Sequence, residues 1–273
     1  MNLPLPASSP TAMLRRGHGF LPVFTFGLVR VVRWSRVLLV AAGSAGLGAV
    51  VGFEASRTDR PAEALAVVLD RGVLAFGLPV VTLLLAGEGF AFETHARTLV
   101  YHLVRPVSRV TVFLARFLSG WVPSALASLA LLLAVVLASG VAFPAHAFPG
   151  LAATAALATL TLGAIYYTLG ALFRNGLVAG LVYTFVVETL VSSVPGAMQT
   201  FSVMFQVRSL AHHATAGVLP SAPAAEGTSI LPGATLVADA TPTGAAVALL
   251  LVAAIVLAVG AWRTARRDFA LKD

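Results

Sequence analysis

The chain contains no cysteine among its 273 residues. Disulfide bonds, thiolate metal sites and cysteine nucleophiles are therefore excluded. Lysine is almost as scarce, because Lys272 is the one lysine among 18 basic residues. It lies outside any Gly-x-x-x-x-Gly-Lys-Ser/Thr sequence, so the chain has no P-loop with which to hydrolyse ATP. His-Glu-x-x-His and Gly-x-Ser-x-Gly are also absent, which leaves a zinc protease and a serine hydrolase without sequence support.

Charged residues are few, at 11% of the chain, against 58% hydrophobic residues and a mean hydropathy of +0.92. A soluble domain carries about 25% charged residues. A chain of this length cannot bury so much apolar surface in a water-soluble core, so the expected solvent is a lipid bilayer. The net charge of +7 would indicate nucleic acid only if the basic residues formed one patch, and they are spread along the chain.

Long apolar segments determine the expected fold, since about 20 apolar residues cross the hydrocarbon core as a helix. We predict an all-α integral membrane protein, with residues 1–273 forming a single six-span domain. The six predicted spans are residues 35–53, 72–92, 117–142, 148–173, 176–195 and 244–262.

Two further segments have helical patterns. Residues 20–36, FLPVFTFGLVRVVRWSR, combine arginines with an apolar face, which predicts an amphipathic helix in the membrane interface. The alternative is that they extend the first span. Residues 196–243 form the predicted extracytoplasmic segment, helical or re-entrant, with Phe201, Phe205 and Leu210 able to share one face.

The basic residues give the expected orientation. With the N-terminus inside the cell, 14 of the 18 basic residues lie in inside segments, and four lie outside. This distribution follows the positive-inside rule and places both termini in the cytoplasm. The excess of arginine over lysine is typical of GC-rich genes, which indicates a bacterial source. The expected membrane is therefore the bacterial cytoplasmic (inner) membrane. The four outside residues are Arg57, Arg60, Arg71 and Arg208.

A few polar residues lie in or beside the predicted spans. Glu188 is about twelve residues into the fifth span, with Thr184 and Ser192 near it, and Glu88 lies at the inner end of the second. An intramembrane carboxylate is costly and marks a candidate translocation or proton-relay site. A carboxyl group hydrogen-bonded between helices is the alternative. The histidine pairs His95–His102 and His212–His213 lack an evident third ligand, so no metal site is predicted.

The predicted inside loop between the second and third spans, residues 93–116, begins ETHARTLVYHLVRPVSR. Thr98, Leu99 and Leu103 suggest a short amphipathic helix. Pro106 would end this helix, and Ser108 can cap the next one. Membrane anchoring needs only one or two arginines, so a structured segment here indicates a protein partner at the cytoplasmic face.

This stretch resembles the permease subunits of ATP-binding cassette (ABC) transporters of the type-two exporter family. The resemblance is carried by a Glu, a Thr-Leu pair and Leu-x-x-Pro-Val-Ser-Arg, although Arg97 replaces the family's usual glycine. The resemblance implies that the loop includes a coupling helix that docks on a separate ATPase subunit. The coupling residues would be Glu93, Thr98, Leu99, Leu103, Arg105, Pro106, Ser108 and Arg109.

The same resemblance implies the partners and the activity. The chain would be noncatalytic and bind no cofactor, while ATP and Mg²⁺ would bind two copies of the partner ATPase. A second permease, identical or different, would complete the translocation path among membrane lipids. The alternative is a proton-coupled secondary transporter that uses Glu188 and Glu88 as relay carboxylates. Against it, we find none of the inverted repeats that many such transporters have.

Overall fold

The computed structural model describes residues 20–87, 108–173, 175–188, 191, 200–220 and 240–266. Throughout these ranges the regular elements are helices, with no strand. Several helical elements follow one another directly, where α-helix passes into π-helix (η). The elements are α1 (Phe20–Val31), α2 (Trp34–Arg57), α3 (Pro61–Val67), η2 (Val68–Gly77), α4 (Leu78–Thr82), η3 (Leu83–Gly87), α7 (Arg109–Ala138), α8 (Phe148–Leu172), α9 (Gly176–Val182), η4 (Tyr183–Glu188), α11 (Val203–Thr215) and α12 (Pro242–Arg266).

Five helices in the described ranges are long and apolar enough to cross a membrane, which gives the chain the character of a multi-pass membrane protein. They are Trp34–Arg57, Pro61–Gly87, Arg109–Ala138, Phe148–Leu172 and Pro242–Arg266. The remaining predicted span, 176–195, begins as the shorter helix Gly176–Glu188, and most of the rest lies outside the described residues. A sixth span therefore stays a prediction.

Two helices begin earlier than predicted. The second starts at Pro61, 11 residues before the expected position, because Pro61 suits a first helical turn and the helix continues through Asp70 and Arg71. The third starts at Arg109, where Ser108 caps it as predicted. Residues 109–116, expected as part of the loop, are thus the first two turns of α7.

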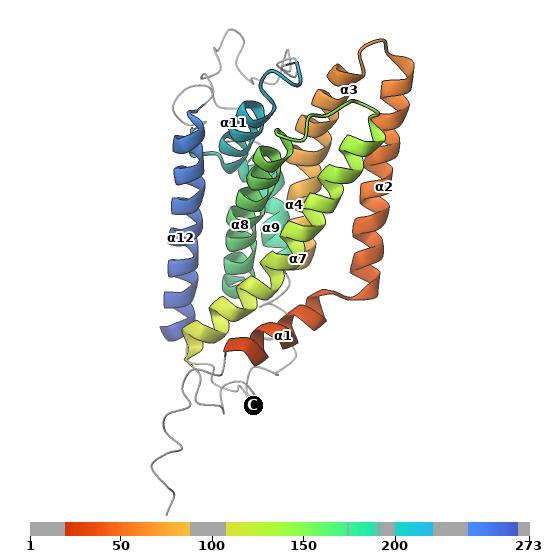
Figure 1. Ribbon diagram of the computed structural model, residues 1–273. Helices are drawn as coiled ribbons and strands as arrows, with labels where there is room; N and C mark the ends of the chain where they lie inside the picture. The colour runs from red at the N-terminus through yellow and green to blue at the C-terminus, as the bar shows by residue number, and fades with distance from the viewer. Residues whose placement is uncertain are drawn as a thin grey trace, which may run out of the picture.

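The helices form a bundle in which α7 and α8 lie centrally, while α2 and α12 lie at opposite edges (Figure 1). Threonines of α8 bond to the backbone of α12: Thr161 Oγ1 lies 3.1 Å from the Leu249 carbonyl oxygen, and Thr168 Oγ1 lies 3.4 Å from that of Val256. Such short polar side chains join helices at close range without leaving a buried hydroxyl unsatisfied.

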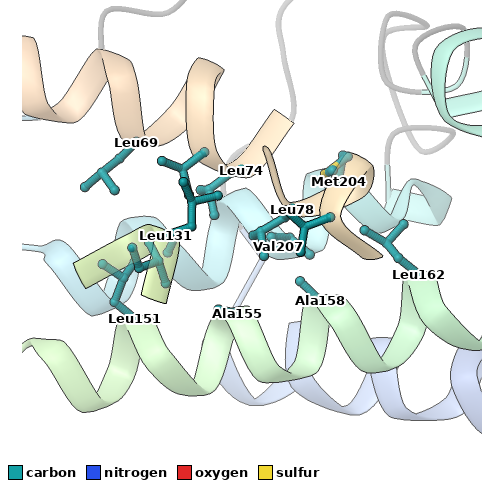
Figure 2. Close-up of a cluster of buried hydrophobic side chains, with 14 of the residues drawn as sticks. Leu69, Leu74, Leu78, Leu131, Leu151, Ala155, Ala158, Leu162, Met204 and Val207 are labelled. Atoms are coloured by element: carbon teal, nitrogen blue, oxygen red, sulfur yellow. The ribbon is translucent and has the colours of Figure 1, made fainter. Parts of the chain in front are cut away.

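The main core lies where η2, α4, α7, α8 and α11 meet. Figure 2 shows leucines of η2, α4 and α7 in one cluster with Leu151, Ala155, Ala158 and Leu162 of α8. Met204 and Val207 bring α11 into the same cluster (Figure 2). The short helix α11 is therefore packed into the bundle. Within the predicted segment 196–243, residues 203–215 form a helix, but Phe201 precedes it and is 78% exposed, so the predicted apolar face with Phe201 is wrong.

The predicted helix at residues 20–36 exists but is shorter and separate. It ends at Val31, and the backbone at Arg33 is extended, with φ −90° and ψ 144°, before α2 begins. α1 therefore crosses the end of the bundle at a steep angle to α2 (Figure 1). The alternative, one continuous helix with the first span, is wrong because of this break.

Contact between α1 and α7 depends on Gly27. A Cβ atom at Gly27 would overlap the Ser119 side chain and come within 2.7 Å of Arg116 Nη1. Val23 packs beside it against Val112 and Ala115 of α7. The absence of a side chain at Gly27 thus lets α1 lie directly on α7.

Candidate functional site

Four of the twelve predicted site residues lie in the described part of the chain: Ser108, Arg109, Thr184 and Glu188. In the structure these four residues form two pairs. Ser108 and Arg109 lie at the start of α7, and Thr184 and Glu188 lie in η4. The other predictions concern residues outside the described ranges: Glu88, Glu93, Thr98, Leu99, Leu103, Arg105, Pro106 and Ser192.

Ser108 and Arg109 form the junction between the predicted coupling loop and α7. The Ser108 hydroxyl accepts a hydrogen bond from the Thr111 amide at 3.1 Å, which satisfies one of the free amides at the helix start. The Arg109 guanidinium donates from Nη1 to the Ala265 carbonyl in the last turn of α12, at 3.4 Å. The end of the loop is therefore fixed to two long helices.

Replacing Ser108 with alanine is expected to lower the free energy of unfolding by about 1 kcal/mol, because the Thr111 amide loses its cap. The Ser108→Thr variant keeps a capping hydroxyl and should lose much less. Unfolding of both purified variants in mixed detergent micelles measures the difference. Equal stabilities of Ser108→Ala and the unaltered chain would contradict the capping assignment.

α7 connects this junction with most of the bundle. It packs against α1, α2, α8 and α12, and it also contacts η2, α4 and η3. A displacement of its first turn would therefore be transmitted to helices at both edges of the molecule.

Glu188 ends η4 and is buried, with 4% of its surface exposed. Its Oε1 accepts a hydrogen bond of 2.8 Å from the Met204 amide, in the first turn of α11. The Ser202 hydroxyl caps the next amide, that of Phe205, at 3.1 Å. At this helix end a carboxyl group is close to free backbone amides and to the positive end of the helix dipole. Both interactions offset the cost of burying it.

Thr184 lies one turn before Glu188 on the buried side of η4. Its hydroxyl donates to the Gly180 carbonyl at 2.9 Å, so the Tyr166 hydroxyl, 2.6 Å away, serves as donor to Thr184. Tyr166 in turn packs edge-on against Tyr183, with 6.4 Å between ring centroids. Thr184 and Glu188 thus join the same segment to α8 and α11, respectively.

An open apolar groove of about 550 Å³ lies on the other side of this segment. Tyr183 and Val187 line it together with residues of α8 and α9, whereas Thr184 and Glu188 do not. The two predicted polar residues therefore face helix contacts, which is the alternative that sequence reasoning had left open for Glu188.

Sequence reasoning missed two charged contacts. Asp70 Oδ1 lies 3.0 Å from Arg208 Nε and joins η2 to α11, although Asp70 was expected in an outside loop and Arg208 in the separate extracytoplasmic segment. Arg116 was expected to be a loop anchor, yet it is only 4% exposed and its Cζ lies 5.7 Å from the Phe26 ring centroid. The interruption of apolar sequence by Asp70 and Arg71 resembles a loop, so no local signal could have identified the first contact.

No protein-family model matches the chain, and no curated protein sequence matches it.

Proposed function

We propose that this chain is the permease subunit of an ATP-driven ABC transporter of the exporter type. It forms half of a translocation path and couples to a separate ATPase subunit, two copies of which serve a pair of permeases. The observation that carries the proposal is the junction at Ser108, where the motif shared with such permeases leads directly into the central helix α7.

The mechanical argument follows from the contacts of α7. An ATPase that moves the loop displaces the first turn of α7, and α7 passes the motion to the helices it packs against, α1, α2, α8 and α12. ATP binding then shifts the population between inward-facing and outward-facing states, provided that the ATPase contacts them differently. The missing P-loop fits this division of labour, because the partner supplies the hydrolysis.

The arrangement of the arginines supports the proposed orientation. One end of the bundle holds the starts of α2 and α7 and the end of α12, and the other end holds the end of α2 and the helix α11 (Figure 1). Arg33, Arg109 and Arg263 belong to the elements at the first end, and Arg57 and Arg208 to those at the second. Most of the basic residues in the described ranges lie at the first end, which would face the cytoplasm, with both termini there. The membrane would be a bacterial inner membrane. Exposed apolar side chains on α2, α9 and α12 would face lipid or the second permease.

The proton-coupled alternative gains no support from the contact made by Glu188. A relay carboxylate must exchange protons with a path, whereas this carboxyl group is buried and accepts from the Met204 amide. Glu188 therefore fits a helix cap better than a proton relay.

Variants at the loop test the proposal. Glu93→Gln and Arg109→Gln are expected to reduce ATP hydrolysis by the purified permease–ATPase complex about tenfold. Glu93→Gln would remove a docking contact of the ATPase, and Arg109→Gln would weaken the bond that holds the first turn of α7 to the Ala265 carbonyl. Arg109→Lys is included because a lysine can still donate to the Ala265 carbonyl. Arg60→Gln is the matched control, an exposed arginine at the other end of the bundle, paired with Glu63 at 3.0 Å.

Amounts of each chain in the membrane should be unchanged, and this is measured by quantitative blotting. If the Glu93→Gln and Arg109→Gln complexes both hydrolyse ATP at the rate of the Arg60→Gln complex, the docking proposal is wrong.

A further inference from the structure

One face of α1 is occupied and the opposite face is exposed. Val23, Gly27 and Val31, each four residues apart, are buried, and Val23 and Gly27 lie against α7. On the exposed side Leu21 is 67% and Val29 is 74% exposed. A short helix at the end of a membrane bundle with an exposed apolar face suits the boundary between headgroups and acyl chains.

Three arginines follow this face within seven residues. Arg30 lies in the last turn of α1, Arg33 in the connector and Arg36 in the first turn of α2. Burial, and secondly the neighbouring charges of Arg33 and Arg36, lower the pKa of Arg30, which fits three guanidinium groups lying close together. Arg116 adds a guanidinium on the α7 side, close to Arg30.

Negative charge is absent from this part of the sequence. Residues 1–53 contain no aspartate or glutamate, and the first acidic residue is Glu54. Glu54 lies near the far end of α2, about 27 Å along the helix from Arg36. The nearby Trp34 is 76% exposed, as is typical of tryptophans at the level of lipid headgroups.

We propose that α1 and the α1–α2 junction form a docking surface for anionic phospholipids. The guanidinium groups of Arg33 and Arg36 bind lipid phosphates, Trp34 lies at the level of the headgroups, and Leu21 and Val29 lie among the upper acyl chains. Guanidinium forks match phosphate oxygens in pairs, which favours arginine over lysine at such a surface. This inference depends on the membrane location alone and does not depend on the transporter proposal.

Lipid titration of the purified full chain in a neutral detergent tests the surface. Dioleoyl phosphatidylglycerol is compared with dioleoyl phosphatidylcholine, and the readout is the lipid concentration that gives half of the rise in melting temperature. Phosphatidylglycerol should act at a much lower concentration. Each arginine contributes about a fivefold change in affinity, so Arg33→Gln should weaken the effect about fivefold and Arg33→Gln/Arg36→Gln about 25-fold.

Two variants serve as controls. Arg33→Lys keeps the charge and should retain most of the preference for phosphatidylglycerol. Arg57→Gln removes an exposed arginine at the other end of α2 and should change nothing. Melting temperatures in phosphatidylcholine alone show whether each variant is folded.

A second measurement uses lipid brominated near the headgroup and follows tryptophan fluorescence. Brominated phosphatidylglycerol should quench the unaltered chain more than brominated phosphatidylcholine does, and Trp34→Phe should remove the excess. This readout needs no arginine substitution.

Four results would overturn the proposal. The first is equal action of the two lipids with equal quenching. The second is an equal loss of affinity in Arg57→Gln and Arg33→Gln. The third is an effect of inorganic phosphate as large as that of phosphatidylglycerol, which would indicate a site for free anions. The fourth is an Arg33→Gln chain that keeps its lipid preference but loses a partner protein, which would indicate an acidic protein surface as the occupant.

Discussion

Replacing Glu188 with leucine is expected to lower the free energy of unfolding by about 1–3 kcal/mol, since a buried backbone donor loses its hydrogen-bond acceptor. The Met204 amide, which now donates to Oε1 at 2.8 Å, would remain buried without this acceptor. α11 is held to the bundle by its apolar face and by the Asp70–Arg208 ion pair, so it should loosen without leaving the bundle.

Reversible unfolding of the purified chain in mixed micelles, by titration with a denaturing detergent, measures this effect. Glu188→Gln is the matched control, because its amide oxygen can still accept from Met204, and it should lose less than half as much stability. If Glu188→Leu is as stable as the unaltered chain, the carboxylate does not stabilise α11.

Replacing Gly27 with leucine is expected to separate α1 from α7 and to cost about 1–3 kcal/mol, because the new side chain would overlap a closely packed contact. Even a Cβ atom would meet the Ser119 side chain and Arg116 Nη1. The buried side chains of Arg116 and Ser119 would then become accessible to water.

Gly43→Leu is the control for the loss of a helical glycine. A Cβ atom at Gly43, on an exposed part of α2, meets no atom within 4 Å, so this substitution should be neutral or slightly stabilising. Unfolding titrations and limited proteolysis at the connector between α1 and α2 compare the two. Equal stability and equal proteolysis of both variants would show that Gly27 is not required for docking of α1.

Features determined by local chemistry were predicted well. The predicted span 148–173 is nearly the same as Phe148–Leu172, because the segment is apolar throughout and Pro149 lies at its start. The Ser108 cap followed from a serine placed shortly after Pro106. The separate helix α1 followed from its mixture of arginines and apolar residues.

Features that depend on distant partners were not predictable in the same way. Asp70 is acceptable within a long helix because Arg208, far along the chain, lies beside it. Arg116 is acceptable inside the fold because α1 covers it. At Glu188 the sequence indicated an unusual carboxylate, but its role depends on where α11 begins, and Phe201 misled the assignment of the buried face of α11.

The central claim is that this chain works with a separate ATPase. The most direct test is purification of the tagged, unaltered chain from its own host in a mild detergent, with subunit ratios determined by mass spectrometry. The account predicts one soluble ATPase subunit per permease, with two permeases in each complex. A chain that is recovered under these conditions without any nucleotide-binding partner would contradict it.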